Sequence, residues 1–321
     1  MKFNFYPLTF EPIFKERIWG GVKLKKCLHK NIPSDKIGES WEISTVPNEI
    51  SVVNTGSLKG KSLDEVIALY PVQLLGKKVV EQYGVQFPLL FKYLDAREDL
   101  SVQLHPNDDL ARKRHNSSGK TEMWYVIQAE EGARIIAGFK KEASPKEYIH
   151  HLNAKSLVTI LKEIPVKKGD AFLLETGTIH AIGAGIIIAE IQQTSDITYR
   201  IYDWDRLDAQ GKPRELHIGL ALEAIDYGVS NTHYGYDKFE NSSNPMIQCD
   251  YFKTNYIPLQ GIMTISKDDA SFLVLMCTEG NFTILINDQS YSYQTGDTVL
   301  LPAILTEFEL KGEAILLEIS V

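Results

Sequence analysis

Val-Lys-Lys-Gly-Asp-Ala-Phe-Leu-Leu at residues 166–174 resembles Tyr-Gln-Thr-Gly-Asp-Thr-Val-Leu-Leu at residues 293–301. In both stretches a Gly-Asp turn is followed by a short apolar strand. An acidic residue and a glycine precede each stretch, at residues 131–132 and at residues 279–280. A strand, a tight turn and a second strand in this order are typical of a small jelly-roll barrel. The repeat therefore predicts two such barrels in tandem.

The two copies differ at the position that follows the apolar strand. His180 lies ten residues after Asp170, whereas Glu307 lies ten residues after Asp297 and has no histidine near it. A histidine at the rim of a barrel can take part in chemistry, and the second copy lacks it. We therefore predict that the first barrel carries the chemistry and that the second is a degenerate copy that contributes packing.

A polar linker separates the two predicted domains. Residues 231–244 are rich in Asn, Ser, Gly and Tyr, which is typical of a loop. We expect a catalytic, metal-binding domain over residues 1–235, with N-terminal strands and helices. A degenerate C-terminal domain should cover residues 236–321. The fold class is thus mainly β, with two jelly-roll barrels in tandem and a few helices.

Three segments carry helix signals within this β pattern. Ser62 with Glu65, and Ser144 with Glu147, form capping boxes, so a helix should follow each serine. Residues 214–227 place apolar side chains at helical spacing and end before a glycine. We therefore expect a third helix there.

The composition is that of an ordinary globular protein. Of 321 residues, 44% are hydrophobic and 24% are charged, which argues against disorder and against a coiled coil. The net charge is −8 and no Lys/Arg-rich run is present, so neither nucleic acid nor a membrane is expected as a partner. No apolar run approaches the ~18–20 residues of a membrane span, and the N-terminus lacks a secretory pattern. Three widely separated cysteines fit a reducing compartment, so we expect a cytoplasmic protein.

Two predicted strands place polar residues on one face. Ser101, Gln103 and His105 alternate with apolar residues, so their side chains point the same way. Lys120 and Glu122 lie two residues apart at the start of another strand. A polar face of this kind is either a solvated surface or a site.

Four of the polar residues fall at strand ends of the first predicted barrel: Gln103, His105, Glu122 and His180. Imidazole and carboxylate groups bind zinc with a position left open, and the same set serves non-haem iron. The spacing favours neither metal. An unpaired Glu122 inside a barrel would be costly, and a bound cation would offset that cost.

Residues 188–206 form an aromatic and acidic segment that contains two arginines. Glu190 shares a strand face with Gln192. Arg200 either pairs with a nearby aspartate, Asp196 or Asp203, or presents a fixed cation to an oxyanion or a phosphate. The segment by itself leaves both readings open.

Taken together, six segments resemble the short bacterial form of the type I phosphomannose isomerase family, in the cupin superfamily. Each segment is weak alone, but the ordered set is specific and spans nearly the whole chain. The segments are residues 17–21, 38–44, 88–108, 120–124, 169–183 and 190–206.

The resemblance implies a zinc-dependent aldose–ketose isomerase that interconverts mannose 6-phosphate and fructose 6-phosphate. The family's motifs supply the ligands of one zinc ion per chain, here Gln103, His105, Glu122 and His180. The arginine of the Tyr-Arg pair is catalytic, here Arg200. The serine ahead of Gln-x-His and the basic residue six beyond the arginine bind phosphate, here Ser101 and Arg206.

One segment departs from the family, which usually has Pro-Ala-Gly-Thr before the metal-binding histidine. This chain has Glu-Thr-Gly-Thr at residues 175–178, although the second copy keeps Pro302-Ala303. We expect the ligand set to be unchanged. Glu175 is then either a surface residue or a residue behind the metal ligands.

Isomerisation moves a proton between C2 and C1 of the sugar through a cis-enediol. A metal would polarise the sugar oxygen, and Arg200 would stabilise the developing enediolate. Glu190 and Lys120 are the candidate proton carriers, with a water on the metal as a third, and the sequence does not choose among them.

Two alternatives remain at this point. One is an iron-dependent cupin dioxygenase that uses His105, Glu122 and His180. The other is a cupin that binds a sugar phosphate without turnover. For the isomerase, the expected partner is a small-molecule sugar phosphate, and the protein is a monomer or a homodimer.

Overall fold

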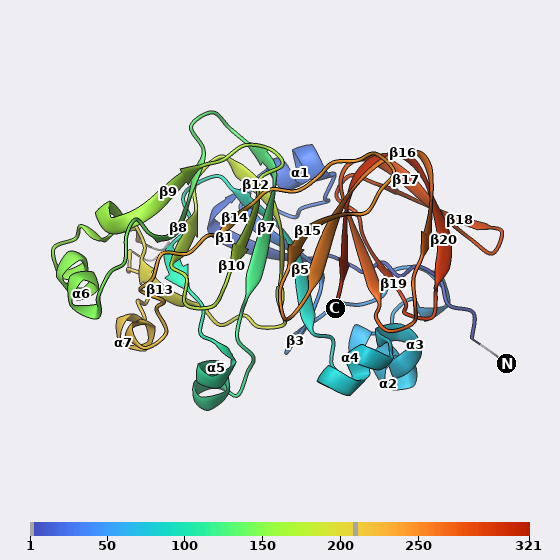
Figure 1. The fold of residues 1–321 in the computed structure, drawn as a ribbon, viewed down its shortest axis with the longest axis horizontal. Helices are drawn as coiled ribbons and strands as arrows, with labels where there is room; N and C mark the ends of the chain where they lie inside the picture. Colours follow the sequence, from blue (N-terminus) through green and yellow to red (C-terminus); the bar gives the residue numbers. More distant parts are fainter. Residues whose placement is uncertain (1–2, 208–210) are drawn as a thin grey trace.

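The computed structural model describes residues 3–207 and 211–321, and most of its regular structure is β-strand (Figure 1). The first sheet has seven strands. In spatial order they are β1 (Ile13–Gly21), β2 (Ile37–Ile43), β5 (Leu89–Ala96), β12 (Ile186–Gln193), β7 (Glu122–Ala129), β10 (Ala171–Leu174) and β14 (His233–Tyr234).

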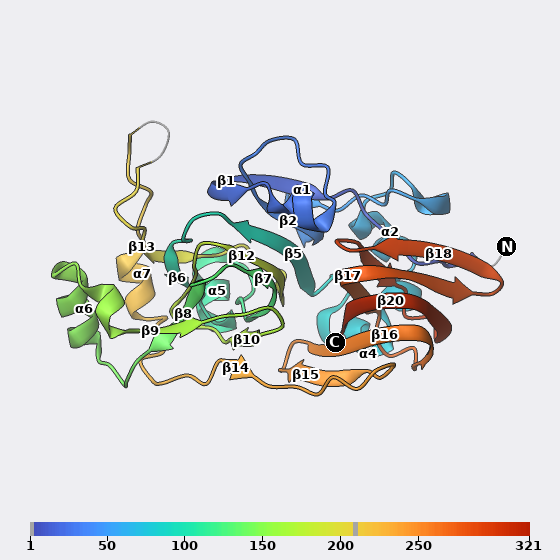
Figure 2. The same cartoon turned by 90° about the horizontal axis from the view of Figure 1, so that it is seen from above.

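The second sheet packs against the first and has five strands. In spatial order they are β13 (Tyr199–Tyr202), β6 (Val102–Leu104), β11 (His180–Ile182), β8 (Arg134–Phe139) and β9 (Leu161–Pro165). Figure 2 shows the two sheets around a common interior. Leu94, Trp124 and Ile188 of the first sheet and Ile135 and Ile182 of the second belong to one buried cluster. This shared apolar layer holds the two sheets in fixed positions relative to each other.

The third sheet comes from the C-terminal part of the chain. Its strands are β15 (Asn244–Gln248), β16 (Lys253–Ser266), β20 (Glu307–Ser320), β17 (Leu273–Ile286) and β18 (Gln289–Gln294), and β19 (Thr298–Leu301) pairs with β17. Figure 1 shows it beside the first sheet. Tyr93 and Ile191 of the first sheet share a buried cluster with Val274 and Met276 of β17. The two parts of the chain therefore have one continuous core between them.

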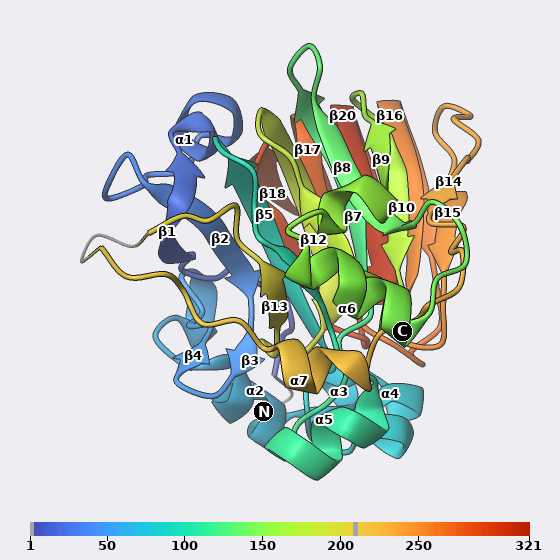
Figure 3. The ribbon, with the colours of Figure 1, turned by 90° about the vertical axis from the view of Figure 1, so that its left-hand side faces the viewer.

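Helices lie at the periphery of the sheets (Figure 3). They are α1 (Lys23–Leu28), η1 (Gly56–Leu58), α2 (Leu63–Leu69), α3 (Pro71–Leu75), α4 (Lys77–Tyr83), α5 (Asp108–His115), α6 (Pro145–Asn153), η2 (Leu157–Ile160) and α7 (Ile218–Leu222). A small two-stranded sheet of β3 (Thr45–Val46) and β4 (Glu49–Ile50) completes the regular structure. Helices α2 and α6 begin at the capping boxes of Ser62 and Ser144, as the sequence predicts.

The predicted helix over residues 214–227 is wrong in its extent, because only Ile218–Leu222 is helical. The residues before α7 bond to β13 instead. The His217 backbone N–H donates to the Arg200 carbonyl at 2.7 Å, and the Arg200 N–H donates to His217 Nδ1 at 3.1 Å. These contacts with a distant strand override the local helical pattern.

The prediction of a mainly β fold is confirmed. Within residues 3–207 and 211–321 no sheet closes into a barrel, so the tandem jelly-roll barrels stay a prediction, as does the division at residue 235. The polar segment 231–244 contributes β14 to the edge of the first sheet and then leads into β15. No helix in the described part of the chain is both long and apolar enough to cross a membrane.

Candidate active site

A row of polar side chains crosses three neighbouring strands of the second sheet. Gln103 of β6 lies opposite His180 of β11 on one side and opposite Arg200 of β13 on the other. Residues directly opposite on antiparallel strands project to the same face. The second sheet therefore presents an amide, an imidazole and a guanidinium side by side.

A second row crosses the first sheet. Glu190 of β12 lies opposite Lys92 of β5 and Trp124 of β7, and Glu122 lies at the start of β7. A cavity of about 390 Å³ takes its lining from both rows. Its polar lining residues are Arg17, Glu39, Lys92, Ser101, Gln103, Lys120, Trp124, His180, Glu190, Asp196, Thr198, Arg200 and Arg214.

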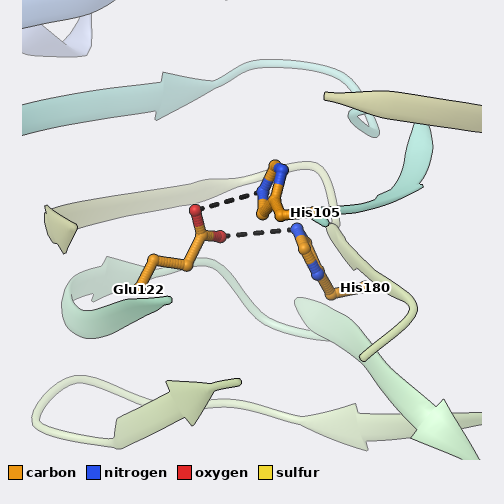
Figure 4. A group of neighbouring side chains, drawn as sticks. All are labelled: His105, Glu122 and His180. Atoms are coloured by element: carbon orange, nitrogen blue, oxygen red, sulfur yellow. Dashed lines mark ion pairs between the residues drawn. The ribbon is translucent and has the colours of Figure 1, made fainter. Parts of the chain in front are cut away.

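His105, Glu122 and His180 form a buried cluster of the kind that holds a metal ion (Figure 4). One ligating atom from each side chain lies within 4.8 Å of the others. His105 Nε2 is 3.2 Å from Glu122 Oε2, and His180 Nε2 is 3.4 Å from Glu122 Oε1. Three residues from separate segments thus direct their polar atoms at one point.

Backbone carbonyls fix the tautomer of both imidazoles. His105 Nδ1 lies 2.9 Å from the Ile197 carbonyl, and His180 Nδ1 lies 2.8 Å from the Thr178 carbonyl. Because a carbonyl only accepts, each Nδ1 carries the proton and each Nε2 presents a lone pair towards Glu122. Metal-binding histidines are oriented by this kind of contact.

The lone pairs at His180 Nε2 and Glu122 Oε1 have no hydrogen-bond partner among the described residues. Two acceptors cannot bond to each other at 3.4 Å, and Lys120 contacts Glu122 Oε2 and His105 instead, so these two buried lone pairs remain available to a bound cation. The donor set fits a divalent metal such as zinc or iron(II).

Burial lowers the pKa of His180, and burial together with Lys120 lowers the pKa of His105 to about 3. Burial alone would raise the pKa of the Glu122 carboxyl, but Lys120 and His105 hold that pKa well below its usual range. The cluster therefore combines two neutral imidazoles with one carboxylate, which is the protonation state that metal binding requires.

Lys120 is buried beside this cluster. Its Nζ lies 2.6 Å from Glu122 Oε2 and 3.0 Å from His105 Nε2, and the side chain also lines the cavity. The sequence places Lys120 and Glu122 on one strand face, and the structure brings them into direct contact.

Arg200 is held without a carboxylate partner in the described residues. Its Nε donates to Ser101 Oγ at 3.3 Å, and Nη1 donates to the Glu215 carbonyl at 3.0 Å. Burial and the neighbouring Arg214 lower the pKa of the guanidinium. Neither aspartate considered from the sequence forms an ion pair with it, because Asp203 pairs with other arginines and Asp196 is exposed. The guanidinium is thus available to an anion in the cavity.

The structure separates Arg206 from the other predicted site residues. Arg206 donates to Asp203 Oδ1 and to the Asp99 carbonyl, both at 2.6 Å. It lines a surface hollow with Asp99, Arg134 and Trp204, and not the cavity beside His180. Ser101, by contrast, lies in the cavity wall.

Sequence reasoning missed five residues that line the cavity: Arg17, Glu39, Lys92, Trp124 and Arg214. One signal was available for two of them. Glu39 and Lys92 are charged residues in strands whose every residue is buried. A charge at such a position needs a partner or a function.

The carboxylates of Glu39 and Glu190 are each held by two donors. Glu39 accepts from Arg17 Nε and Trp41 Nε1, both at 2.7 Å. Glu190 accepts from Lys92 Nζ at 2.9 Å and from Trp124 Nε1 at 3.1 Å. These contacts fix both side chains in the cavity wall.

Glu39→Gln should make the free energy of unfolding less dependent on pH under acidic conditions. Burial alone would raise the pKa of Glu39, but Lys92 and Arg17 lower it to about 2, from 4.5. A carboxyl whose pKa is lower in the folded state stabilises the fold above about pH 4.5, and this stabilisation is lost as the pH falls towards 2. The free energy of unfolding, measured by denaturant titration from pH 7 to pH 3, should fall less steeply in the variant. The contribution is on the order of 3 kcal/mol. Parallel curves for the two proteins would contradict the assignment.

Glu175, where the chain departs from the family's usual motif, is exposed and lies outside the cavity lining. Its backbone carbonyl accepts from the Thr178 N–H at 3.1 Å, which keeps the turn before His180 closed. The side chain is therefore a surface residue, which was one of the two alternatives.

Comparison with known families gives two matches along the chain. Residues 8–142 match the phosphomannose isomerase type I catalytic domain, and residues 242–321 match the mannose-6-phosphate isomerase cupin domain. The chain is 39% identical to a mannose-6-phosphate isomerase of Bacillus subtilis (strain 168), with 96% of each chain covered. It is 38% identical to a mannose-6-phosphate isomerase of Streptococcus mutans, again with 96% of each chain covered.

Solved structures give the same picture of the fold. The crystal structure of the mannose 6-phosphate isomerase from Bacillus subtilis superposes with a TM-score of 0.88 at 34% identity, covering 98% of this chain and 99% of that one. A mutant structure of phosphomannose isomerase from Salmonella typhimurium has a TM-score of 0.79 at 16% identity, with 98% of each chain covered. The arrangement of sheets and helices is therefore retained even where few residues are identical.

Proposed function

Because the chain belongs to the type I phosphomannose isomerase family, and is thereby a mannose-6-phosphate isomerase, we propose that it works with one zinc ion per chain and through a cis-enediol. The reaction interconverts mannose 6-phosphate and fructose 6-phosphate. The observation that carries the zinc proposal is the buried set of lone pairs at His105, Glu122 and His180, beside a cavity with cationic and acidic groups.

His105, Glu122 and His180 would hold the zinc ion, with Gln103 as the fourth ligand. Gln103 is supported by its register, because it lies directly opposite His180 and lines the cavity. When bound, zinc supplies Lewis-acid polarisation of the sugar's carbonyl oxygen. The protein supplies two oriented imidazoles and a carboxylate that is ionised before the metal arrives.

Glu190 and Lys120 are the proposed proton carriers. The Glu190 carboxylate is fixed in the cavity wall by Lys92 and Trp124, with its lone pairs available to accept a proton. The Lys120 ammonium is a donor that also faces the cavity. We assign to Glu190 the transfer between C2 and C1, and to Lys120 the protonation of the developing sugar oxygen.

Arg200 is the proposed stabiliser of the enediolate. It is fixed by Ser101 and by the Glu215 carbonyl, and no carboxylate in the described residues neutralises it. A fixed cation in a partly buried cavity stabilises negative charge that develops in the transition state. Ser101, in contact with Arg200, is proposed to donate to the substrate's phosphate.

The test of this function is a coupled assay for conversion of mannose 6-phosphate to fructose 6-phosphate, run on chelated protein and again after zinc or iron(II) is restored. Turnover should vanish on chelation and return with zinc. Glu122→Gln should lower both zinc content and turnover by at least about 100-fold, since even outer partners of metal ligands cost 10–100-fold. Glu175→Gln is the matched control, because Glu175 is an exposed carboxylate in the turn before His180. This variant should retain its zinc content and its turnover.

Three outcomes would contradict the proposal. Turnover that persists in fully chelated protein would exclude a metal role. Binding of the sugar phosphate without turnover, whichever metal is present, would support the cupin that only binds. Oxygen uptake with iron(II) alone would support the dioxygenase.

The remaining features follow from the same proposal. We propose a cytoplasmic protein of carbohydrate metabolism whose partner is a small sugar phosphate. We also propose that its first two sheets form one jelly-roll barrel and that its C-terminal sheet forms a second, degenerate one. The apolar cluster around Leu275, Ile284 and Leu310 supports a packing role for the C-terminal sheet.

A further inference from the structure

Two arginines near Arg200 differ in their relation to the cavity. Arg214 lines the cavity together with Arg200 and Ser101. Arg206 lines a separate surface hollow. Both pair with the same carboxylate, Asp203, at 2.5 Å for Arg214 and 2.6 Å for Arg206.

The backbone conformation explains why Arg214 lines the cavity and Arg206 lines the separate hollow. Trp204 and Asp205 have φ values of 58° and 53°, in the left-handed region, so the chain turns sharply after Asp203. The Arg206 N–H then donates to the Asp203 carbonyl at 3.0 Å. An isolated bridge between Leu207 and Pro213 brings the chain back, so that the next residue again reaches Asp203. The two arginines thus approach Asp203 from the two arms of one hairpin.

The two guanidinium groups also differ in the donors that remain. Arg206 uses all three nitrogens, with Nε on the Asp203 carbonyl, Nη1 on the Asp99 carbonyl and Nη2 on the Asp203 carboxylate. Arg214 places Nε and Nη2 on the two carboxylate oxygens of Asp203 at 2.7 and 2.5 Å. Its Nη1 has no partner among the described residues. Of these two arginines, Arg214 is the one that lines the cavity and keeps a nitrogen without a partner in the described part of the chain.

This end of the cavity carries an excess of positive charge. Arg17, Arg206 and Arg214 all act electrostatically on Arg200. The buried carboxylates that pair with these arginines are Glu39 and Asp203. The charged side chains that line the cavity are five cations and three carboxylates, which leaves a surplus of two positive charges: Arg17, Lys92, Lys120, Arg200 and Arg214 against Glu39, Glu190 and Asp196. A phosphate monoester carries about −1.5 to −2 charges at pH 7 and matches this surplus.

We propose that Arg214, and not Arg206, binds the phosphate of the substrate in this chain, and that Arg206 is a positioning residue that holds Asp203 and the Asp99 loop. The proposal rests on the proposed function, because it names the residue that binds the phosphate of that substrate. Asp203 orients Arg214 through a two-pronged contact, and Nη1 would donate to a phosphate oxygen in the cavity.

The test compares Arg214→Gln with Arg206→Gln. Each variant removes one arginine from the Asp203 carboxylate, and Arg206→Gln also removes the bond to the Asp99 carbonyl, so the structural loss is at least as large in the control. Arg214→Gln should raise KM for mannose 6-phosphate by about 10- to 100-fold, and the dissociation constant of inorganic phosphate in calorimetry by a similar factor. In this variant the loss should be larger in KM than in kcat. Arg206→Gln should change the phosphate affinity by less than about 5-fold, in keeping with its lack of a cavity contact.

A larger loss of phosphate affinity in Arg206→Gln than in Arg214→Gln would overturn the proposal. So would an Arg214→Gln variant that loses kcat but keeps its affinity for inorganic phosphate, because that result would indicate a positioning role for Arg214. The wild type could fail to isomerise mannose 6-phosphate while Arg214→Gln still lowers the affinity for inorganic phosphate. That result would contradict the proposed reaction and support Arg214 as an anion-binding residue.

Discussion

Glu190→Gln is expected to lower kcat for mannose 6-phosphate by about 10²–10⁴-fold while the metal content stays unchanged. The amide keeps the size of the side chain and one acceptor oxygen, but it cannot take up the proton that moves between C2 and C1. Exchange of the substrate's C2 hydrogen with solvent, followed by NMR in deuterated water, should slow by the same factor. KM should change little, because the substrate still meets Arg200 and Ser101.

Trp124→Phe is the matched control for this substitution. It removes one of the two hydrogen bonds to Glu190, 3.1 Å long, and keeps the carboxylate, so a loss of less than about 10-fold is expected. The unfolding midpoint of Glu190→Gln has to be measured as well, because buried Lys92 loses its ion pair and retains Gln192 Oε1 at 2.7 Å. If a folded, metal-loaded Glu190→Gln kept more than a tenth of normal kcat, the proton transfer between C2 and C1 would have to be assigned to Lys120 instead.

Arg200→Ala is expected to lower kcat by about 10²–10³-fold, the usual effect of removing one stabiliser of a developing oxyanion. The guanidinium lies between Ser101 Oγ and the Glu215 carbonyl, so its position does not depend on the substrate. Arg200→Lys should recover only part of the rate, because a lysine has no planar fork that reaches two acceptors in fixed directions. Steady-state kinetics with the metal content measured on the same samples provide the check.

The fold should tolerate the loss of Arg200. No carboxylate in the described residues pairs with this guanidinium, and after its removal the Ser101 hydroxyl still donates to Gln103 Oε1, so the main loss is the bond to the Glu215 carbonyl. A shift of the unfolding midpoint small enough to leave the protein folded at the assay temperature is therefore expected. Near-normal turnover of a folded and metal-loaded Arg200→Ala would rule out the assigned role.

The metal cluster was predictable because it depends on short-range patterns. Period-two alternation places Gln103 and His105 on one face, and it does the same for Lys120 and Glu122. The repeated Gly-Asp turn marks the strand that leads to His180. The structure confirms that His105, Glu122 and His180 meet. Sequence alone left the choice of metal open, since zinc and iron(II) use the same donors.

The arginines at one end of the cavity were not predictable in the same way. Residues 214–227 have a helical pattern, yet the first four lie outside the helix, where Arg214 bonds to Asp203 and His217 bonds to β13. The resemblance to the family implied Arg206, whereas the chain turns at Trp204 and Arg206 lines a separate hollow. The hairpin that brings Arg214 into the cavity is closed by one backbone bridge, which leaves no signal in the sequence.

The sequence by itself determined the mainly β fold, the helix starts at Ser62 and Ser144, and three side chains that cluster in the structure, His105, Glu122 and His180. Each of these depends on interactions between residues a few positions apart, or on strands whose alternation is set by one buried face. Only the tertiary structure decided which charged residues enter the cavity. Glu39 with Arg17, Glu190 with Lys92, and Arg214 with Asp203 pair across strands or hairpin arms. Burial makes an unpaired charge costly, so the position of each charge depends on the partner that the folded chain brings beside it.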